Sequence, residues 1–189
     1  MKPIRSWLSL LLGVAAGVAF AAPGAGEGAG TGFKLTSPAF PHDGLMPVRH
    51  TGDGADLSPA LAWTEPPAGT RSFALIANDP DAPDPRAPRL VWVHWVLYNI
   101  PATLRGLAEG YRPGALPGAR DGVSDFRRPG YGGPQPPIGT HRYFFKLYAL
   151  DALLPEAKAP PTQAQLEKLM AGHILARAEL VGRYGRPGR

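Results

Sequence analysis

One stretch of the sequence decides the fold class: Val91-Trp92-Val93-His94-Trp95-Val96-Leu97-Tyr98-Asn99-Ile100. Almost every residue in it is β-branched, aromatic or leucine, and Pro101 follows at once, which is typical of a strand that ends there. Because apolar residues occupy consecutive positions rather than every second one, this strand is expected to be covered on both faces. The stretch therefore predicts a central strand of a mainly β protein.

Other segments of the chain have the same character. The further strands expected are 33–36, 61–63, 72–78 and 141–150, with one more short strand within 41–58. Of these, 72–78 and 141–150 are apolar on both alternating faces, as buried central strands are. Residues 105–128 are rich in glycine and proline without periodicity, so a long loop is expected there.

A single helix is expected over residues 162–179. Pro160 and Pro161 precede it, and Thr162 with Gln165 three residues later has the pattern of a capping box. The residues that recur on one face at helical spacing are Leu166, Leu169, Met170, His173 and Ile174. We therefore interpret His173 as a structural residue of that face.

Composition supports a loop-rich β domain and excludes several classes of protein. The 189 residues include 24 Gly and 23 Pro, too many for a helical bundle, while 44% hydrophobic residues suffice for one core. The chain has no cysteine, which excludes disulfides, thiolate metal sites and cysteine nucleophiles. The formal charge of +5 is mild and no run of Lys and Arg is interleaved with aromatics, so nucleic-acid binding is not expected.

The N-terminus has the pattern of an export signal. Lys2 and Arg5 form a charged start, residues 7–20 are apolar but short for a membrane span, and Ala19-Phe20-Ala21 fits a cleavage site. The predicted boundaries are a signal peptide over 1–21, a Gly/Ala-rich leader over 22–32, one folded domain over 33–185 and a basic tail over 186–189. The expected location is periplasmic or secreted, with no integral membrane segment after cleavage. An uncleaved anchor helix is the alternative.

Two segments carry ionisable groups that could do chemistry. In Asn78-Asp79-Pro80-Asp81-Ala82-Pro83, prolines hold two carboxylates in a defined turn directly after a strand. Taken alone, this pattern is more typical of a turn whose carboxylates accept hydrogen bonds from its own backbone. His94 stands in the middle of a strand, where it is expected to share a face with Trp92, Val96 and Tyr98, and a lone strand histidine is more often a core residue.

A third segment, Gly139-Thr140-His141-Arg142-Tyr143, begins another strand. His141 and Tyr143 are two residues apart, so their side chains point to the same face. Before it lies the loop Gly130-Tyr131-Gly132-Gly133-Pro134, whose backbone amides could form a concave site for an anion. Most such glycine pairs are only turns.

Several motifs, taken together, indicate a resemblance to a known family that no single motif indicates. They are Leu57-Ser58-Pro59-Ala60-Leu61-Ala62-Trp63, Asn78 to Pro83, Val93-His94-Trp95, Gly130 to Pro134 and Gly139 to Tyr143, in this order. The chain resembles the phosphatidylethanolamine-binding protein family in its bacterial branch, which is similar to the Raf kinase inhibitor proteins of animals. The resemblance extends over residues 33–184.

The resemblance implies a large antiparallel sheet packed on a smaller one, with a helix near the C-terminus. It also implies a small pocket for phosphate-type anions or phospholipid head groups, and a further role as an inhibitor of a protein partner. Carried over by motif, the binding residues are Asp79, Asp81, His94, Gly132, Gly133, Pro134, His141 and Tyr143. The chain departs from the bacterial pattern at Gly52 and Gln135, where cysteines are usual, and at Ser124, where Asn is common.

The charged and polar residues of such a pocket determine how it would bind an anion. Two carboxylates would repel a phosphate, so donors must outweigh them: His94, His141, Tyr143 and the amides of the glycine loop. The aspartates would then orient the imidazoles and favour their charged form. We therefore expect anion binding to take up a proton and to strengthen as the pH falls.

The preferred interpretation is a binding protein that is not an enzyme and needs no cofactor or metal, because no serine stands beside a base. One alternative is a hydrolase in which the two histidines and two aspartates hold a divalent ion such as Zn²⁺. Another is a protein-interaction module with a vestigial pocket, which would use residues 105–128.

Overall fold

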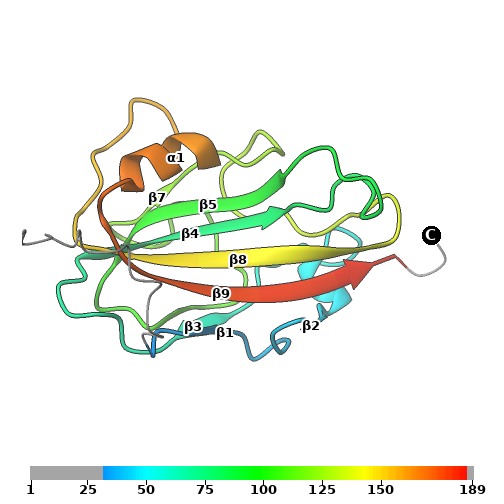
Figure 1. The fold of residues 1–189 in the computed structure, drawn as a ribbon, viewed down its shortest axis with the longest axis horizontal. Coiled ribbons are helices and arrows are strands. Elements are labelled where there is room, and N and C mark those ends of the chain that lie inside the picture. The colour runs from blue at the N-terminus through cyan, green and yellow to red at the C-terminus, as the bar shows by residue number, and fades with distance from the viewer. Residues whose placement is uncertain (1–31, 187–189) are drawn as a thin grey trace, which may run out of the picture.

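The computed structural model describes residues 32–186, which form two packed β-sheets and one short helix (Figure 1). The small sheet has the strand order β1-β3-β6, with β1 Leu35–Thr36, β3 Leu61–Trp63 and β6 Gly106–Leu107. The large sheet has the order β2-β9-β8-β4-β5-β7, with β2 Gly44–Leu45, β9 Ile174–Gly185, β8 Thr140–Leu150, β4 Ser72–Asp79, β5 Trp92–Pro101 and β7 Arg120–Asp121. Neighbouring strands are antiparallel except β2 and β9. The predicted fold class is confirmed.

The centre of the large sheet is buried on both faces, since every residue of β4 is buried. Along β9 and the first part of β8, exposed or half-buried residues alternate with buried ones, so one face of the sheet is partly open to solvent there. One cluster, which includes Phe73, Trp95 and Phe145, fills the space between the sheets. A second cluster lies on the outer face, where Leu166 and Met170 of helix α1 (Gln163–Met170) pack against the sheet. Figure 1 shows α1 on the side of β5 and β7, and the small sheet on the opposite side.

Most of the expected strands are present, and the loops hold more structure than expected. The strands predicted at 61–63, 72–78, 91–100 and 141–150 correspond to β3, β4, β5 and β8, and the one predicted at 33–36 is shorter. The stretch 41–58 contains β2 and a 3₁₀ helix, Val48–His50. The expected loop 105–128 contributes β6 and β7, because each pairs with a longer strand.

The helix predicted over 162–179 is too long. The Thr162–Gln165 capping box is present, but the helix ends at Met170, and Gly172 adopts a positive φ of 84°. The residues beyond it form β9, which pairs with β8 along its whole length. His173 therefore lies on no helix face; its Nδ1 atom is 2.8 Å from Asp151 Oδ1 in an exposed pair.

The predicted signal peptide, nearly all of the leader and residues 187–189 of the predicted tail lie outside the described residues. Within residues 32–186, no helix is long and apolar enough to cross a membrane.

Candidate functional site

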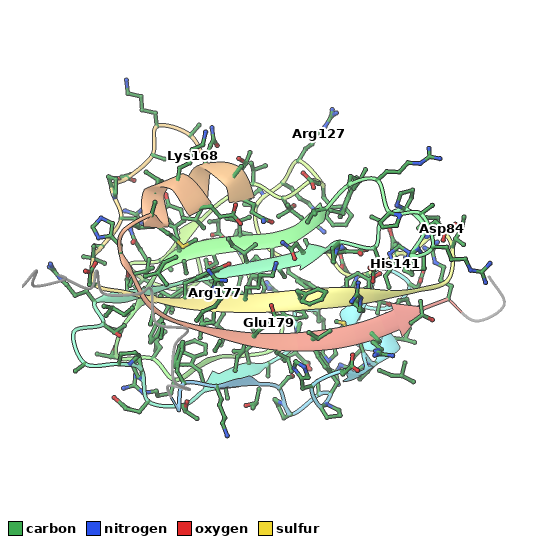
Figure 2. The ribbon with its side chains drawn as sticks, viewed as in Figure 1. Asp84, Arg127, His141, Lys168, Arg177 and Glu179 are labelled. Carbon is green, nitrogen blue, oxygen red and sulfur yellow. The ribbon has the colours of Figure 1, made fainter. Side chains whose placement is uncertain are left out.

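A cavity of about 240 Å³ opens where β4 ends and where β5 and β8 begin. Its lining residues are Asp79, Ala82, Pro83, Leu90, Trp92, His94, Phe126, Gln135, Pro136, Pro137, His141 and Tyr143. Because β4 runs antiparallel to both neighbours, the segments that follow β4 and begin β5 and β8 meet at one end of the sheet. Figure 2 shows His141 and Asp84 at this end.

A β-bulge places His94 at the cavity. β4 pairs with Val93 and Trp95 but skips His94, which is therefore the extra residue of the bulge. The bulge changes which side chains share a face: Val96 and Tyr98 lie in the core beneath α1, whereas His94 lines the cavity. The expectation that His94 shares a face with Val96 and Tyr98 is wrong.

His94 is held as a neutral ring. Its Nδ1 atom lies 2.6 Å from the Gly132 carbonyl oxygen, an acceptor, so Nδ1 carries the hydrogen and Nε2 keeps a lone pair. Burial lowers the pKa of His94, against the opposing effects of the Gly132 carbonyl and the charge of Asp79. The ring packs edge-on against Tyr143 and Phe126, at centroid distances of 5.2 and 5.5 Å. His94 therefore offers the cavity an acceptor.

His141 and Asp79 form a buried pair. His141 Nδ1 lies 2.7 Å from Asp79 Oδ2, and His141 Nε2 lies 2.9 Å from the Ile138 carbonyl oxygen. Because both ring nitrogens face acceptors, the pair holds either an imidazolium with a carboxylate or a neutral ring with a carboxyl group. In both cases its net charge is zero. The two side chains are only 1% and 5% exposed, so His141 cannot donate to a ligand without losing one of these bonds.

Asp81 faces Arg142 instead of a histidine. Its two oxygens accept hydrogen bonds from Nη2 and Nε of Arg142 at 2.7 and 2.9 Å, and one also accepts from the Arg142 backbone N–H. These bonds lower the pKa of Asp81. Asp81 does not line the cavity, so the expectation that both aspartates orient imidazoles holds only for Asp79 with His141.

Tyr143 lines the cavity, and its buried hydroxyl has no hydrogen-bond partner among residues 32–186. Burial raises the pKa of Tyr143, so the group stays an O–H donor. Leaving such a donor unpaired costs roughly 1–3 kcal/mol. This hydroxyl is therefore an unpaired donor in a residue that lines the cavity.

The glycine loop has a structural role that its pattern did not predict. The Gly132 N–H donates to the His94 carbonyl at 3.0 Å, and the Gly133 N–H donates to Asp56 Oδ1 at 2.6 Å. A Cβ on Gly132 would lie 2.5 Å from the Phe126 ring, so glycine allows close packing there. Gly132, Gly133 and Pro134 do not line the cavity, and the two glycine amides are engaged within the protein.

Several cavity residues and two ionic partners were not predicted from the sequence. The missed lining residues are Ala82, Pro83, Leu90, Trp92, Phe126, Gln135, Pro136 and Pro137. Arg142 stands between His141 and Tyr143, so its place beside the site was readable from the motif. The ionic partner of Arg128, Asp56, lies far away in sequence, and no local pattern indicates that contact.

These motifs and this fold lead to one family. A family model described as phosphatidylethanolamine-binding protein matches residues 36–185. The chain belongs to the phosphatidylethanolamine-binding protein family.

Bacterial and archaeal proteins are among the relatives of this chain. A UPF0098 protein of Methanothermobacter thermautotrophicus is 45% identical over 155 residues, which cover 81% of this chain and 99% of that protein. A phosphatidylethanolamine-binding protein homologue of Chlamydia trachomatis, CT736, has a solved structure with a TM-score of 0.74 and 36% identity, covering 82% of this chain and 97% of that one. The structure of Escherichia coli YbcL also gives a TM-score of 0.74, with 31% identity and coverage of 82% and 99%.

Proposed function

We propose that this protein binds the phosphate of a phosphorylated head group in the 240 Å³ cavity. The observation that carries the proposal is the Tyr143 hydroxyl, a buried donor left unpaired by the rest of the described chain. Native proteins pair such groups, and exceptions call for an explanation such as a ligand. The family description, phosphatidylethanolamine-binding protein, supports the same class of ligand.

The charges around the cavity support a phosphate carrying one negative charge. Asp79 is neutralised by His141, and Asp81 by Arg142, so the site is not the doubly negative one that the sequence suggests. A phosphate monoanion has both an acceptor oxygen for the Tyr143 hydroxyl and a P–O–H that can donate to Nε2 of His94. A dianion would bring a second charge that no free cation among the lining residues balances.

The mouth of the cavity supports a head group attached to carbon chains. Leu90 and Ile138 are 47% and 52% exposed, although both are large and apolar. Leu90 lines the cavity, and Ile138 directly follows the lining residue Pro137. Arg86 and Arg89 stand in the loop that leads to Leu90. An amphiphile with an anionic head suits this arrangement better than an inorganic ion.

We also infer that the protein binds its ligand without converting it. The lining contains no serine, threonine or lysine that could serve as an activated nucleophile. Within residues 32–186, no group of three or more His, Asp and Glu is placed to hold a metal ion, so the metal-hydrolase alternative has no support. Inhibition of a protein partner stays a prediction from the family resemblance.

Substitution of Tyr143 by phenylalanine should lower the affinity for the ligand without lowering the free energy of unfolding. The free energy of unfolding should stay the same or rise by up to about 1 kcal/mol, because the hydroxyl has no protein partner to lose. The affinity for phosphorylethanolamine should fall about 10- to 100-fold, the value of a hydrogen bond to a charged group. Titration calorimetry and chemical denaturation measure the two quantities.

A matched control is Tyr148→Phe, the same change in the same strand but on the face beneath α1. It should leave the affinity unchanged. If Tyr143→Phe binds phosphorylethanolamine as tightly as the unmodified protein does, the hydroxyl is no part of the site.

The affinity for phosphorylethanolamine should fall as the pH rises. The second pKa of a phosphate monoester is about 6, so between about pH 6 and 8 the monoanion becomes scarce and the affinity should drop about tenfold per pH unit. Below about pH 6 it should level off, because the monoanion then predominates. Calorimetry in buffers of different ionisation enthalpy should show uptake of nearly one proton per ligand at about pH 8. An affinity independent of pH, with no buffer dependence, would contradict a bound monoanion.

We propose, finally, that the chain is exported and processed. The support is the charged start, the apolar stretch and the Ala19-Phe20-Ala21 pattern. Intact-mass measurement of the exported protein should find Ala22 as its first residue. Residues 1–21 retained in a membrane fraction would instead establish the anchored alternative.

A further inference from the structure

One edge of strand β9 is paired with another strand only near its C-terminal end. β8 pairs with β9 from Ile174 to Gly185 on one side, but β2 pairs with it on the other side only at Gly182 and Arg183. Within the described chain, 32–186, no strand pairs with the outer side of residues 176–180, which we call the free edge. A strand edge of this kind is a template for another strand.

The backbone groups at the free edge belong to Arg177 and Glu179. The carbonyls of Val181 and Arg183 accept hydrogen bonds from Asp43 and Met46, so they point outward, away from β8. Pairing with β8 is regular from Ala176 to Gly185, and outward-pointing residues alternate along a strand. The N–H and C=O groups of Arg177 and Glu179 therefore also point outward. Their exposed side chains are labelled on β9 in Figure 2.

The free edge is complementary to itself. In an antiparallel pairing of two copies centred on Ala178, Arg177 of each copy lies directly opposite Glu179 of the other. Each pair then exchanges two backbone hydrogen bonds, and the opposed side chains form a cross-strand ion pair. We propose that a second copy of this chain binds at the free edge, giving a two-fold dimer with one continuous sheet through both subunits.

Charge selects this register over its neighbours. Centring the pairing on residue 177 would place Arg177 opposite Arg177, and centring it on 179 would place Glu179 opposite Glu179, which like-charge repulsion disfavours. The pairing cannot extend past Leu180, because the outward N–H and C=O groups of Val181 already bond to His42 and Asp43. No residue of β9 lines the cavity, so this dimer is independent of the proposed binding function.

The test uses charge reversals followed by sedimentation analysis of the purified protein. Arg177→Glu makes both edge positions acidic, and Glu179→Arg makes both basic, so each variant alone should be a monomer. An equimolar mixture of the two should dimerise, because every opposed pair then has opposite charges. The double variant Arg177→Glu with Glu179→Arg should also dimerise. Lys168→Glu, a reversal of the same sign on α1, is the control and should stay dimeric.

Circular dichroism should show that all variants are folded, since both side chains are exposed. The proposal is overturned if the unmodified protein stays monomeric up to about 1 mM, a concentration at which even a weak dimer would be populated. It is also overturned if the single variants dimerise like the unmodified protein, or if the mixture of folded variants stays monomeric. The last result would show that another register or surface is used.

Discussion

Replacing Asp79 by alanine is expected to lower the free energy of unfolding by about 3–5 kcal/mol, the range for removing one partner of a buried ion pair. The change leaves His141 with both ring nitrogens buried and one of them without its acceptor. It also removes the acceptor for the Asp81 backbone N–H, which lies 2.8 Å from Asp79 Oδ1. Chemical denaturation measures the effect.

The control is Glu65→Ala, which breaks the ion pair with Arg105 at the surface and should cost at most about 1 kcal/mol. A double-mutant cycle with Asp79→Ala and His141→Gln should show strong coupling, so that the double variant loses less than the sum of the single losses. Additive effects, or an Asp79→Ala loss as small as that of Glu65→Ala, would refute the buried pair.

Introducing cysteines at positions 52 and 135 is expected to raise the free energy of unfolding by about 2–4 kcal/mol under oxidising conditions. Gly52 and Gln135 are in direct contact: the Gln135 side-chain N–H donates to the Gly52 carbonyl at 2.7 Å, and a Cβ on Gly52 would lie 2.5 Å from Gln135 Cγ. A disulfide here would restrict a long loop of the unfolded chain. These are the positions where the sequence resemblance expects cysteines.

The reduced form of the same double variant is the control, and it should be no more stable than the unmodified protein. Mass measurement after alkylation reports whether the bond forms. Free thiols that persist under oxidising conditions, or a bond without added stability, would show that the two loops are not held as the structure places them.

Sequence patterns predicted the strands whose apolar residues follow one another along the chain. The uninterrupted apolar runs predicted strands covered on both faces, which holds for β4 but in β8 only for residues 147–150. The family resemblance implied that Asp79, His94, His141 and Tyr143 line one pocket. The segment after Gly172 was predicted as helix because its apolar residues also fit helical spacing. Pairing with β8 along the whole segment outweighs that preference.

The details of the site depend on contacts between residues far apart in the sequence, which no pattern of neighbouring residues indicates. The bulge that turns His94 toward the cavity depends on the register with β4. The amides of the glycine loop look free in the sequence, but one of them bonds to Asp56, 77 residues away along the chain. The charge balance depends on Arg142 turning toward Asp81. Each involves residues brought together only by the folded chain.

The most direct test of the binding site is to follow backbone amide shifts by NMR while phosphorylethanolamine is titrated into the protein at about pH 6, where the monoanion is abundant. We expect saturable shifts concentrated at His94, Phe126 and Tyr143 around the cavity, and their loss in Tyr143→Phe. Saturable shifts confined to another hollow, such as the one lined by Arg71 and Arg120, would contradict it. So would the absence of any saturable shift.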